Sequence, residues 1–311
     1  MTEVVSTESS QYLAKLIAYR LGVSHRHTVR KVFGDSEKYY RLDITDAREL
    51  AGKDVVFVAS THTDDDLLEL YRVGSTLADM GTRRRIFVIP FLGYSTMERA
   101  VNPGEIVTAK YNVRLLSSIP SSGMGNIFLF LDLHKPGLVH YFEDSSLRQE
   151  LSAVSLLGDA ISTRVRGDFV LASADLGMLA PVQALSERFG MDVAFVHKKR
   201  NFTTTKVLSV VGDVKGKQVV IYDDMVRSGG SLIQASEAYL HKGAKSVMAV
   251  VSHLALNNVG VAKELKQSAI ETIISTNSHP MSEKVEALGD NFFTIADISP
   301  IYTELISDYL S

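Results

Sequence analysis

The stretch VVIYDDMVRSGGSL, residues 219–232, decides the fold. Its first four residues are β-branched or aromatic and form the short apolar run of a buried strand, which we expect to stop at Asp223 and Asp224. A small, hydroxylated segment follows, and Leu232–Leu240 then resumes a helical pattern. The order of strand, loop and helix is typical of an α/β protein.

The loop between this strand and this helix has the composition of an anion site. A glycine-rich loop that opens a helix directs backbone N–H groups and the positive end of the helix dipole at one point, which suits a phosphate. No Walker lysine follows the glycines and no GxGxxG pattern is present, so the loop is neither of those two types. The residues that we expect around a phosphate are Arg227, Ser228, Gly229, Gly230 and Ser231.

Asp223 and Asp224 require a different partner, because carboxylates repel phosphate. Vicinal sugar hydroxyls can donate hydrogen bonds to a carboxylate. A lone acidic pair or a lone pair of glycines is usually an ordinary strand end with solvated side chains. The acids and the loop in one order favour a site for a ribose that carries a 5-phosphate.

Strand-like and helix-like segments alternate along the whole chain, which is the rhythm of parallel sheets covered by helices. Two similar rounds of this alternation suggest an internal duplication, although their sequences do not visibly repeat. We therefore expect an α/β fold with two similar domains, each a mostly parallel sheet flanked by helices. The first is expected to span residues 1–150, joined by a final helix over 299–311, and the second residues 151–298.

Composition limits the classes of partner and compartment. The 311 residues carry a formal net charge of -3, which gives no electrostatic reason to expect nucleic acid. Cysteine is absent, so disulfides, thiol nucleophiles and cysteine metal sites are excluded. The first residues lack a basic start followed by an apolar core, and no apolar run approaches membrane-spanning length. We expect a cytoplasmic protein that does not bind membranes.

Residues 219–232 resemble the phosphoribosyl pyrophosphate (PRPP) loop shared by type I phosphoribosyltransferases and PRPP synthetases. The whole chain is similar to the ribose-phosphate pyrophosphokinase (PRPP synthetase) family, and within it to the plant-type class II enzymes. The resemblance implies two type I phosphoribosyltransferase-like domains. It also implies transfer of the pyrophosphoryl group of Mg-ATP to the 1-hydroxyl of ribose 5-phosphate, giving PRPP and AMP, with Mg²⁺ as cofactor. The usual loop has an acid where Arg227 stands, and threonines where Ser228 and Ser231 stand.

The segment FGDSE, residues 33–37, is by itself an acidic turn. It resembles a Phe-x-Asp-Gly-Glu segment of the family that reaches across a subunit interface to the adenine of ATP. Phe33, Asp35 and Glu37 match this segment, and Ser36 replaces the glycine. The resemblance implies stacking by Phe33, acceptance of hydrogen bonds by the two carboxylates, and a homo-oligomer with its ATP site at a subunit interface.

The segment IPFLGYSTMER, residues 89–99, resembles the ATP loop of the family. Thr96 and Met97 stand where the main class has arginine and glutamine, and the order Thr-Met-Glu-Arg is closer to the class II pattern. The resemblance assigns Glu98 and Arg99 as ATP contacts. Without it, the two residues are equally well described as a solvated pair on a loop.

A histidine and an aspartate each follow a predicted strand. His134 belongs to Asp-Leu-His after the apolar run Phe128–Leu131, and ligands of α/β folds bind at such strand ends. The resemblance assigns His134 to ATP and the metal, and Asp175 to the metal, since Ala172–Gly177 is similar to the family's Ser-Pro-Asp-Ala-Gly. Mg²⁺ needs only one or two protein ligands beside phosphate oxygens and water. A satisfied histidine and a structural cap are the alternatives.

The basic cluster HKKR, residues 197–200, follows a predicted strand and enters a polar loop. A charge run of this kind is usually a solvated face. In the family, a Lys-x-Arg at this place is the catalytic pair on a flexible loop that closes over ATP, and Lys198 and Arg200 match its spacing. Phosphoryl-type transfer needs positioning and positive charge on the oxygens of the transferred group, which two cations can supply.

Three other functions remain open from the sequence. The same chemistry could act on another 5-substituted ribose such as ADP-ribose, because Thr96, Met97 and Arg227 could reflect a changed pocket. A phosphoribosyltransferase shares the PRPP loop but does not need a catalytic lid or two similar halves. A catalytically silent regulatory subunit is the third, and the retained Lys198 and Arg200 argue against it.

Overall fold

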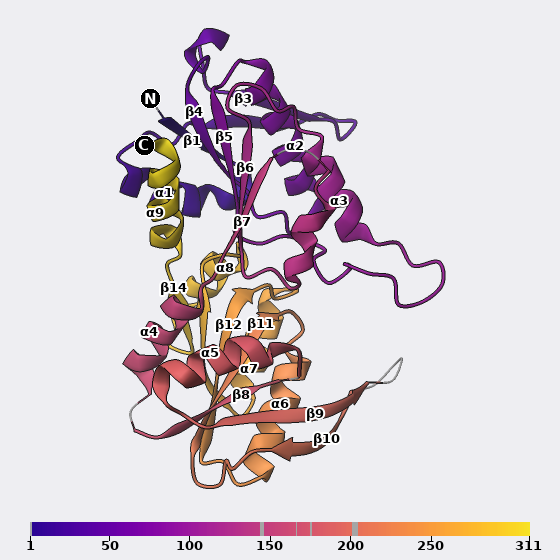
Figure 1. Ribbon diagram of the computed structural model, residues 1–311, viewed down its shortest axis with the longest axis vertical. Helices are drawn as coiled ribbons and strands as arrows, with labels where there is room; N and C mark the ends of the chain where they lie inside the picture. The colour runs from indigo at the N-terminus through magenta and orange to yellow at the C-terminus, as the bar shows by residue number, and fades with distance from the viewer. Residues whose placement is uncertain (1, 144–145, 166, 175, 201–204) are drawn as a thin grey trace. The chain divides into compact units, whose positions relative to one another are not determined.

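The computed structural model describes residues 2–143, 146–165, 167–174, 176–200 and 205–311. The chain divides into two compact units, one formed by Met1–Leu151 with Ser299–Ser311 and the other by Ser152–Ile298 (Figure 1). Each unit contains a mostly parallel sheet with helices packed on it, which confirms the predicted α/β class.

The sheet of the first unit has five strands in the order β1-β4-β5-β6-β7, and every neighbouring pair is parallel. Its inner strands consist of continuous apolar runs because both faces of the sheet are covered. The strands are β1 (Thr2–Ser6), β4 (Asp54–Val58), β5 (Arg84–Ile89), β6 (Asn126–Leu131) and β7 (Leu147–Leu151). The helices of this unit are α1 (Gln11–Leu21), α2 (Asp64–Asp79), α3 (Thr108–Ser117) and α9 (Ser299–Leu310).

The core of the first unit contains a run of phenylalanines contributed by adjacent strands. The rings of Phe87 and Phe128 stack with their centroids 4.8 Å apart, and Phe142 lies 4.8 Å from Phe128 on the other side. Because the strands are parallel, the segments that follow β4, β5 and β6 all leave from one edge of the sheet. The predicted ATP loop and His134 follow two of these strands.

The first unit also carries a separate antiparallel hairpin, β2 (Thr28–Val32) and β3 (Lys38–Leu42), which the sequence did not predict. Its strands are short and mostly half-buried or exposed, so they lack the long apolar run of a core strand. Arg30 attaches the hairpin to the body of the unit. Its guanidinium donates to Glu69 Oε1 on α2, with Nη2 at 2.6 Å, and to the carbonyl oxygen of Ser6 at 2.7 Å.

The final helix, α9, packs against the first helix, α1, and Figure 1 shows the two side by side. Arg20 Nε donates a 2.7 Å hydrogen bond to Ser299 Oγ, and Tyr302 and Ile306 are fully buried. Tyr309 donates from its hydroxyl to Gln149 Oε1 at 3.0 Å. The first unit is therefore assembled from both ends of the chain.

The sheet of the second unit has seven strands in the order β10-β9-β8-β11-β12-β13-β14. All neighbouring pairs are parallel except β9 and β10. The strands are β8 (Phe169–Ser173), β9 (Val193–Arg200), β10 (Thr205–Val211), β11 (Gln218–Val226), β12 (Ser246–Leu254), β13 (Ile270–Thr276) and β14 (Phe293–Ala296). The helices are α4 (Val154–Arg164), α5 (Leu179–Phe189), α6 (Gly230–His241), α7 (Val259–Gln267) and α8 (Met281–Glu286).

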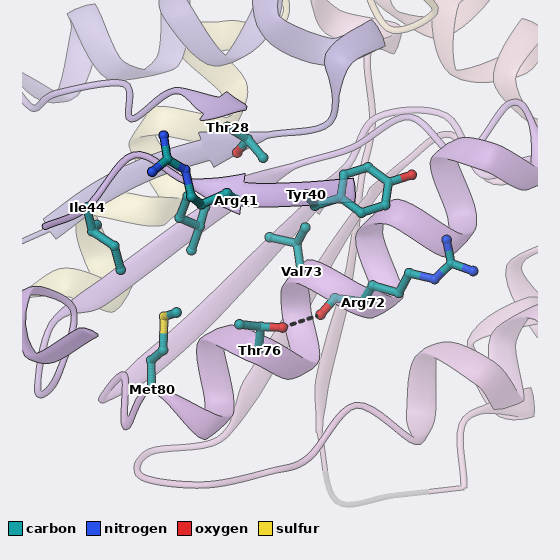
Figure 2. Close-up of a pocket in the computed structure, with 9 residues that line it drawn as sticks. Thr28, Tyr40, Arg41, Ile44, Arg72, Val73, Thr76 and Met80 are labelled. Carbon is teal, nitrogen blue, oxygen red and sulfur yellow. Dashed lines mark hydrogen bonds between the residues drawn. The ribbon is translucent and has the colours of Figure 1, made fainter. Parts of the chain in front are cut away.

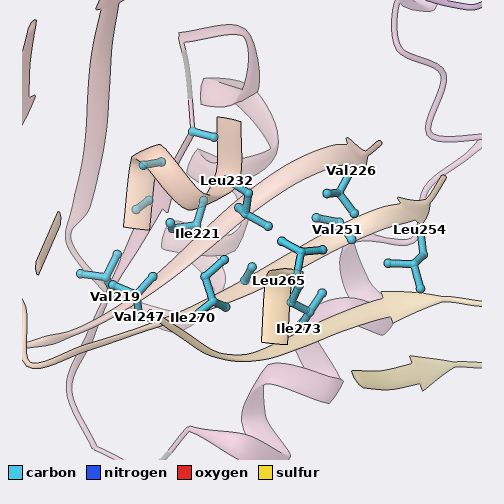
Figure 3. Close-up of a cluster of buried hydrophobic side chains, with 14 of the residues drawn as sticks. Val219, Ile221, Val226, Leu232, Val247, Val251, Leu254, Leu265, Ile270 and Ile273 are labelled. Atoms are coloured by element: carbon cyan, nitrogen blue, oxygen red, sulfur yellow. The ribbon is translucent and has the colours of Figure 1, made fainter. Parts of the chain in front are cut away.

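The segment that decides the fold lies at the centre of this sheet. Val219 and Ile221 of β11 point into a core that includes Val247 and Val251 of β12 (Figure 3). Leu232 on α6 and Leu265 on α7 cover the same face. The apolar run that the sequence showed before the acids is thus the middle strand of the second unit.

One expectation about β11 was wrong. The strand does not stop at Asp223 but continues to Val226. Its pairing with β8 ends at Tyr222, whereas its pairing with β12 goes on through Asp223 and Met225 to Val226. Because β12 is longer than β8, pairing with β12 keeps the backbone of β11 extended. The two acids therefore lie among the last residues of the strand and not after it.

Candidate active site

The acidic pair lies near the end of β11, the central strand of the second unit, where this strand is paired on one side only. Asp223 is half-buried and Asp224 is 9% exposed. The backbone N–H of Asp224 donates to Asp223 Oδ1 at 3.0 Å, which fixes one carboxylate against the strand. β8 ends at Ser173, opposite Tyr222, so none of the described residues on that side pairs with the two acids. Their position can therefore accept a polar ligand.

The loop after the acids opens α6 as predicted, and Gly229 determines its shape. Gly229 has φ +77°, in the left-handed region, and α6 begins at Gly230. A Cβ at Gly229 would lie 3.0 Å from Leu265 Cδ2, so the loop also packs closely on α7. Asn257 donates from its backbone N–H to the carbonyl oxygen of Arg227 at 3.1 Å. Glycine is thus required at this position for both conformation and space.

The other loop residues face outward. Arg227, Ser228 and Ser231 are exposed, and Gly230 is half-buried. Backbone N–H groups of the first turn of α6 point along the helix axis towards its N-terminal end, as in any helix. The arrangement suits an anion at the open side of the loop.

The strand order of the second unit places this loop at a reversal of the fold. From β8 the chain passes to β9 on one side and later returns to β11 on the other. Ligands of open α/β sheets bind in the crevice that such a reversal creates. The segment after β8 contains Asp175, which lies outside the described residues; Ser173, the last residue of β8, is opposite Tyr222.

Buried polar side chains, which the sequence did not single out, link the ends of three strands beside the acids. The Tyr222 hydroxyl lies 3.0 Å from Ser252 Oγ, and Thr276 Oγ1 donates to the carbonyl oxygen of Ser252 at 2.6 Å. Ser278 Oγ lies 3.2 Å from the same carbonyl and 2.7 Å from His253 Nδ1. These groups hold β11, β12 and β13 in register where the acids sit. In the sequence, the available signal for these groups is that polar residues directly follow the apolar runs of the strands.

Lys198 and Arg200 were expected on a loop, and the structure corrects this. β9 continues through Arg200 and pairs antiparallel with β10, so that Lys198 is opposite Val207 and Arg200 is opposite Thr205. The two residues therefore lie in the last part of a β-hairpin, which Figure 1 shows extending beyond the rest of its sheet. Residues 201–204, which join the strands, lie outside the described residues.

In the first unit, Glu98 and Arg99 lie in the long segment between β5 and α3. Arg99 Nε is 3.6 Å from Glu98 Oε1, and the Glu98 side chain is 16% exposed while that of Arg99 is 75% exposed. Tyr141 donates from its hydroxyl to the backbone carbonyl of Glu98 at 2.6 Å. The structure thus anchors Glu98 and leaves the Arg99 guanidinium available to a ligand.

The beginning of the same segment is fixed by a close backbone contact. Gly93 N donates to Thr61 Oγ1 at 3.0 Å, and Thr61 N donates to the carbonyl oxygen of Phe91 at 3.0 Å. Tyr94 then has φ +61° and donates from its hydroxyl to Asp64 Oδ1 at 2.7 Å. The hydrogen bond to Asp64 raises the pKa of Tyr94 above its ordinary value, with burial adding to it. Gly93 was not among the predicted site residues.

His134 follows β6 at the same edge of the sheet as the Glu98 segment. Asp132 has φ +37°, which turns the chain, and Leu133 N donates to Glu150 Oε1 at 2.8 Å. Burial raises the pKa of Glu150. His134 itself is half-buried. The first unit therefore brings His134 and the Glu98 segment to one edge of its sheet.

Phe33, Asp35 and Glu37 form the tip of the β2–β3 hairpin, and the next residue, Lys38, is paired with Asp65 at the start of α2. The turn closes by a hydrogen bond from Phe33 N to the carbonyl oxygen of Glu37 at 2.9 Å, and Asp35 Oδ1 accepts from Glu37 N at 3.1 Å. Ser36 has φ +73°, the conformation that favours the glycine found in the family's version of this segment. The Phe33 ring is 50% exposed and is available for stacking.

Two absences concern only the part of the chain that the structure describes. There, no group of three or more histidine, aspartate or glutamate side chains is arranged to hold a metal ion. In the same residues, no helix has the length and apolar character needed to cross a membrane.

Comparison with known proteins identifies the family. Residues 2–119 match the N-terminal domain of ribose phosphate pyrophosphokinase, and residues 179–309 match the phosphoribosyl synthetase-associated domain. A ribose-phosphate pyrophosphokinase of Vibrio cholerae is 32% identical over 282 residues, covering 89% of this chain and 86% of the relative. The chain belongs to the ribose-phosphate pyrophosphokinase family. The resemblance seen in the sequence is thereby confirmed, and the chain is an enzyme.

Other members of the ribose-phosphate pyrophosphokinase family match over similar lengths. The enzyme of Saccharolobus solfataricus is 31% identical over 263 residues, which are 82% of this chain and 85% of the relative. The crystal structure of phosphoribosylpyrophosphate synthetase from Mycobacterium smegmatis superposes with a TM-score of 0.86 at 23% identity, covering 99% of this chain and 98% of that one. That structure confirms the ribose-phosphate pyrophosphokinase fold. Membership of class II stays a prediction.

Proposed function

We propose that this enzyme transfers the pyrophosphoryl group of ATP to the 1-hydroxyl of ribose 5-phosphate, giving PRPP and AMP. The observation that carries the proposal is the arrangement at the carboxyl end of β11. A pair of carboxylates lies near the end of the central strand. The strand ends two residues later and is followed by a loop with a left-handed glycine at the N-terminus of α6. Family membership supports the same reaction.

In this proposal the two ends of the sugar are bound by chemically different groups. Asp223 and Asp224 accept hydrogen bonds from the ribose hydroxyls. The 5-phosphate is bound by the loop of Arg227, Ser228, Gly229, Gly230 and Ser231, through backbone N–H groups, hydroxyls and the Arg227 guanidinium. The buried contacts between Tyr222 and Ser252 support the strand end from behind.

ATP is assigned to residues of the first unit. Glu98, Arg99 and His134 are proposed to contact it from one edge of the sheet, and Phe33, Asp35 and Glu37 from the tip of the hairpin. Following the family resemblance of residues 33–37, we propose that the hairpin tip serves the adenine of a second copy in a homo-oligomer. The exposed Phe33 ring supports this assignment, because stacking on a base needs an open aromatic face.

The transfer itself makes one bond and breaks one. The oxygen of the 1-hydroxyl attacks the β-phosphorus of ATP, its proton passes to solvent, and the bond between the β-phosphorus and the α,β-bridging oxygen breaks, so that AMP leaves. Lys198 and Arg200 are proposed to stabilise the negative charge on the transferred group. Their position near the end of a projecting hairpin supports a role in covering the bound nucleotide.

Mg²⁺ is proposed to enter with the ATP phosphates. The described residues lack a ready-made cluster of metal ligands, which fits a cation held mainly by phosphate oxygens and water. Asp175 is the carboxylate proposed to contact it, and His134 is proposed to act through a bound water, since Mg²⁺ prefers oxygen ligands to imidazole. The cation would neutralise phosphate charge.

A second acceptor is favoured by one observation. Arg227 is exposed at the open side of the loop, where most relatives carry an acid, so a 5-substituent with more negative charge, such as that of ADP-ribose, would meet a cation instead of a carboxylate. A catalytically silent regulatory subunit is the remaining alternative. We place the protein in the cytoplasm, where its proposed substrates occur.

One assay separates these functions. The purified full chain is incubated with Mg-ATP and either ribose 5-phosphate or ADP-ribose, and AMP and the pyrophosphorylated product are followed. AMP and PRPP formation with ribose 5-phosphate would support the proposal, and product only with ADP-ribose would move the acceptor assignment. Absence of AMP with both acceptors would contradict an active pyrophosphokinase and leave the regulatory subunit.

A further inference from the structure

A cavity of about 310 Å³ lies in the first unit between the β2–β3 hairpin and α2 (Figure 2). None of the residues proposed to bind ATP or ribose 5-phosphate lines it. At about 30 Å³ for each molecule of liquid water, its volume corresponds to roughly ten waters. That is the lower end of the range for small-molecule sites. The cavity is therefore separate from the proposed active site and suits a compact ligand.

The cavity exists because short side chains face one another in the middle of the hairpin–helix contact. In the hairpin, Thr28 is opposite Leu42, so these two share the face that is turned to α2. On α2, Val73 and Thr76 lie one turn apart on the face below them. Thr28, Val73 and Thr76 are too short to fill the space, although the longer Leu42 also lines it.

The two ends of the cavity differ chemically, as Figure 2 shows. At one end lie the Tyr40 hydroxyl and the Arg72 guanidinium. At the other end Ile44 and Met80 present aliphatic and thioether groups. A ligand with one polar and one apolar end would therefore fit in one direction only.

The lining is positively charged. Of its nine residues two are arginines and none is acidic. Glu69 of α2 is already bound by Arg30, with Arg30 Nη2 2.6 Å from Glu69 Oε1. Figure 2 shows the Arg41 guanidinium turned away from α2, so Arg72 is the cation at the polar end. Arg72 is exposed at the rim, where it can meet an entering anion.

One polar group in the wall lacks a partner. Thr28 is 3% exposed, and among the described residues its hydroxyl has no hydrogen-bond partner. The Thr76 hydroxyl, by contrast, donates to the carbonyl oxygen of Arg72 at 2.8 Å. Less than 1 Å² of the Thr28 hydroxyl oxygen is accessible, so this hydroxyl lies behind the cavity surface, and a ligand could bond to it only if the wall shifted.

We propose that this cavity binds a small organic anion with an apolar body. The anionic group, a phosphate or a carboxylate, would lie at Arg72 and Tyr40, and the apolar body would extend over Val73 towards Ile44 and Met80. A cation would meet Arg72 without a balancing carboxylate in the lining, and a purely apolar ligand would leave the guanidinium without an anionic partner.

The test uses the purified full chain without ATP or ribose 5-phosphate, so its outcome does not depend on the proposed reaction. The probe is the fluorescent anion 1-anilinonaphthalene-8-sulfonate (ANS), displaced by four competitors at equal concentration. Phenyl phosphate and hexanoate carry both parts of the ligand, inorganic phosphate only the charge, and hexanol only the apolar body. We expect displacement by one or both of the first two and not by the last two. Which of them competes better separates a phosphate from a carboxylate source.

Variants of the lining residues test whether the ANS signal comes from the cavity. Val73→Phe and the rim substitution Thr76→Phe fill it by two routes, and at least one is expected to fold with an unchanged melting temperature and to lose ANS binding. Arg72→Met should weaken binding at least about tenfold, the usual effect of losing a charge-assisted hydrogen bond. Lys31→Gln is the matched control, since Lys31 is an exposed cation of the same hairpin outside the cavity lining, and should bind as the wild type.

Three results would overturn the proposal. The first is ANS binding that neither filling variant changes. The second is displacement by hexanol as strong as by hexanoate, which would show a groove without preference for anions. The third is a change of oligomer mass in both filling variants, measured by sedimentation, with no ANS binding to the wild type; a second copy of the chain would then occupy the cavity.

Discussion

A Cβ on Gly93 would lie 1.9 Å from the carbonyl oxygen of Thr61. No side chain fits in that space, and the neighbouring atom is backbone, which cannot rotate away. The contact joins the segment after β4 to the segment after β5, and the latter carries Glu98 and Arg99. The proposed ATP loop thus starts from a fixed point on the adjacent strand end.

Gly93→Ala is expected to displace this loop. Overpacking of this kind costs about 1–3 kcal/mol of stability, and the shift should raise KM for ATP more than KM for ribose 5-phosphate. Gly137→Ala is the control, because a Cβ there meets nothing within 4 Å. Steady-state kinetics and a melting curve check both. An unchanged KM for ATP in a folded Gly93→Ala protein would show that the segment does not bind ATP.

Gly229→Ala should affect the other substrate. The change forces alanine into φ +77° and brings its Cβ to 3.0 Å from Leu265 Cδ2, so strain in the loop is added to a tight contact that shifts either the loop or the Leu265 side chain. Because backbone N–H groups of the loop are proposed to bind the 5-phosphate, KM for ribose 5-phosphate should rise at least about tenfold, equivalent to ~1.4 kcal/mol.

Gly216→Ala separates that effect from backbone strain alone. Gly216 has φ +72°, close to that of Gly229, but a Cβ there meets nothing within 4 Å. Both variants should lose a similar amount of stability through strain, about 1–2 kcal/mol. Only Gly229→Ala should change KM. An equal rise of KM in both would refute the phosphate assignment.

Lys198→Ala and Arg200→Ala should each lower kcat by more than tenfold while KM changes less. Groups that act mainly on the transition state have this signature. Lys199→Ala, between them but outside the Lys-x-Arg pattern, is the matched control and should stay within a few-fold of the wild type. If kcat of Lys198→Ala fell by less than tenfold, a change of only ~1.4 kcal/mol in the barrier, the catalytic assignment would be withdrawn.

Acid should destabilise the first unit through Glu3. Burial raises the pKa of this carboxyl, but hydrogen bonds from Arg26 Nη2, at 2.8 Å, and Lys53 Nζ, at 2.7 Å, outweigh it and lower the pKa from 4.5 to about 2. A pKa lowered by folding stabilises the protein above pH 4.5, and this contribution is lost as the pH falls towards about 2. The shift corresponds to at most about 3 kcal/mol.

Glu3→Gln should therefore lower the free energy of unfolding at neutral pH and lose part of its dependence on pH over that acid window. Urea unfolding at a series of pH values measures this. Glu8→Gln, at an exposed position of the same unit, should keep the wild-type dependence. Parallel pH curves for the wild type and Glu3→Gln would contradict the role of the ion pair.

The sequence predicted the elements that depend on local pattern. The apolar run before Asp223 became the central strand, and the glycine-rich loop opened a helix, because burial and glycine conformation act over a few residues. The β2–β3 hairpin was missed, since its two strands are mostly polar and only Thr28 and Leu42 are buried in them. The extension of β11 and the pairing of β9 with β10 were also missed, because strand length there depends on neighbours distant in the sequence.

The candidate site was foreseen in part. Residues proposed to bind a ligand, such as Asp224 and Arg227, can be recognised in the sequence because their chemistry is unusual beside an apolar strand. The need for a glycine at position 93 cannot be recognised in the sequence. It arises from the carbonyl oxygen of Thr61, and only the folded chain brings the two residues together. The same holds for Ser252 and Ser278, which meet across neighbouring strands.

The packing of α9 on α1 has a consequence for biosynthesis. All of Ser152–Ile298 leaves the ribosome before Ser299, so the second unit can complete its sheet while the chain is still growing. The first unit, although made earlier, must keep the surface of α1 uncovered until α9 arrives. The unit that is translated first is thus the unit that is finished last.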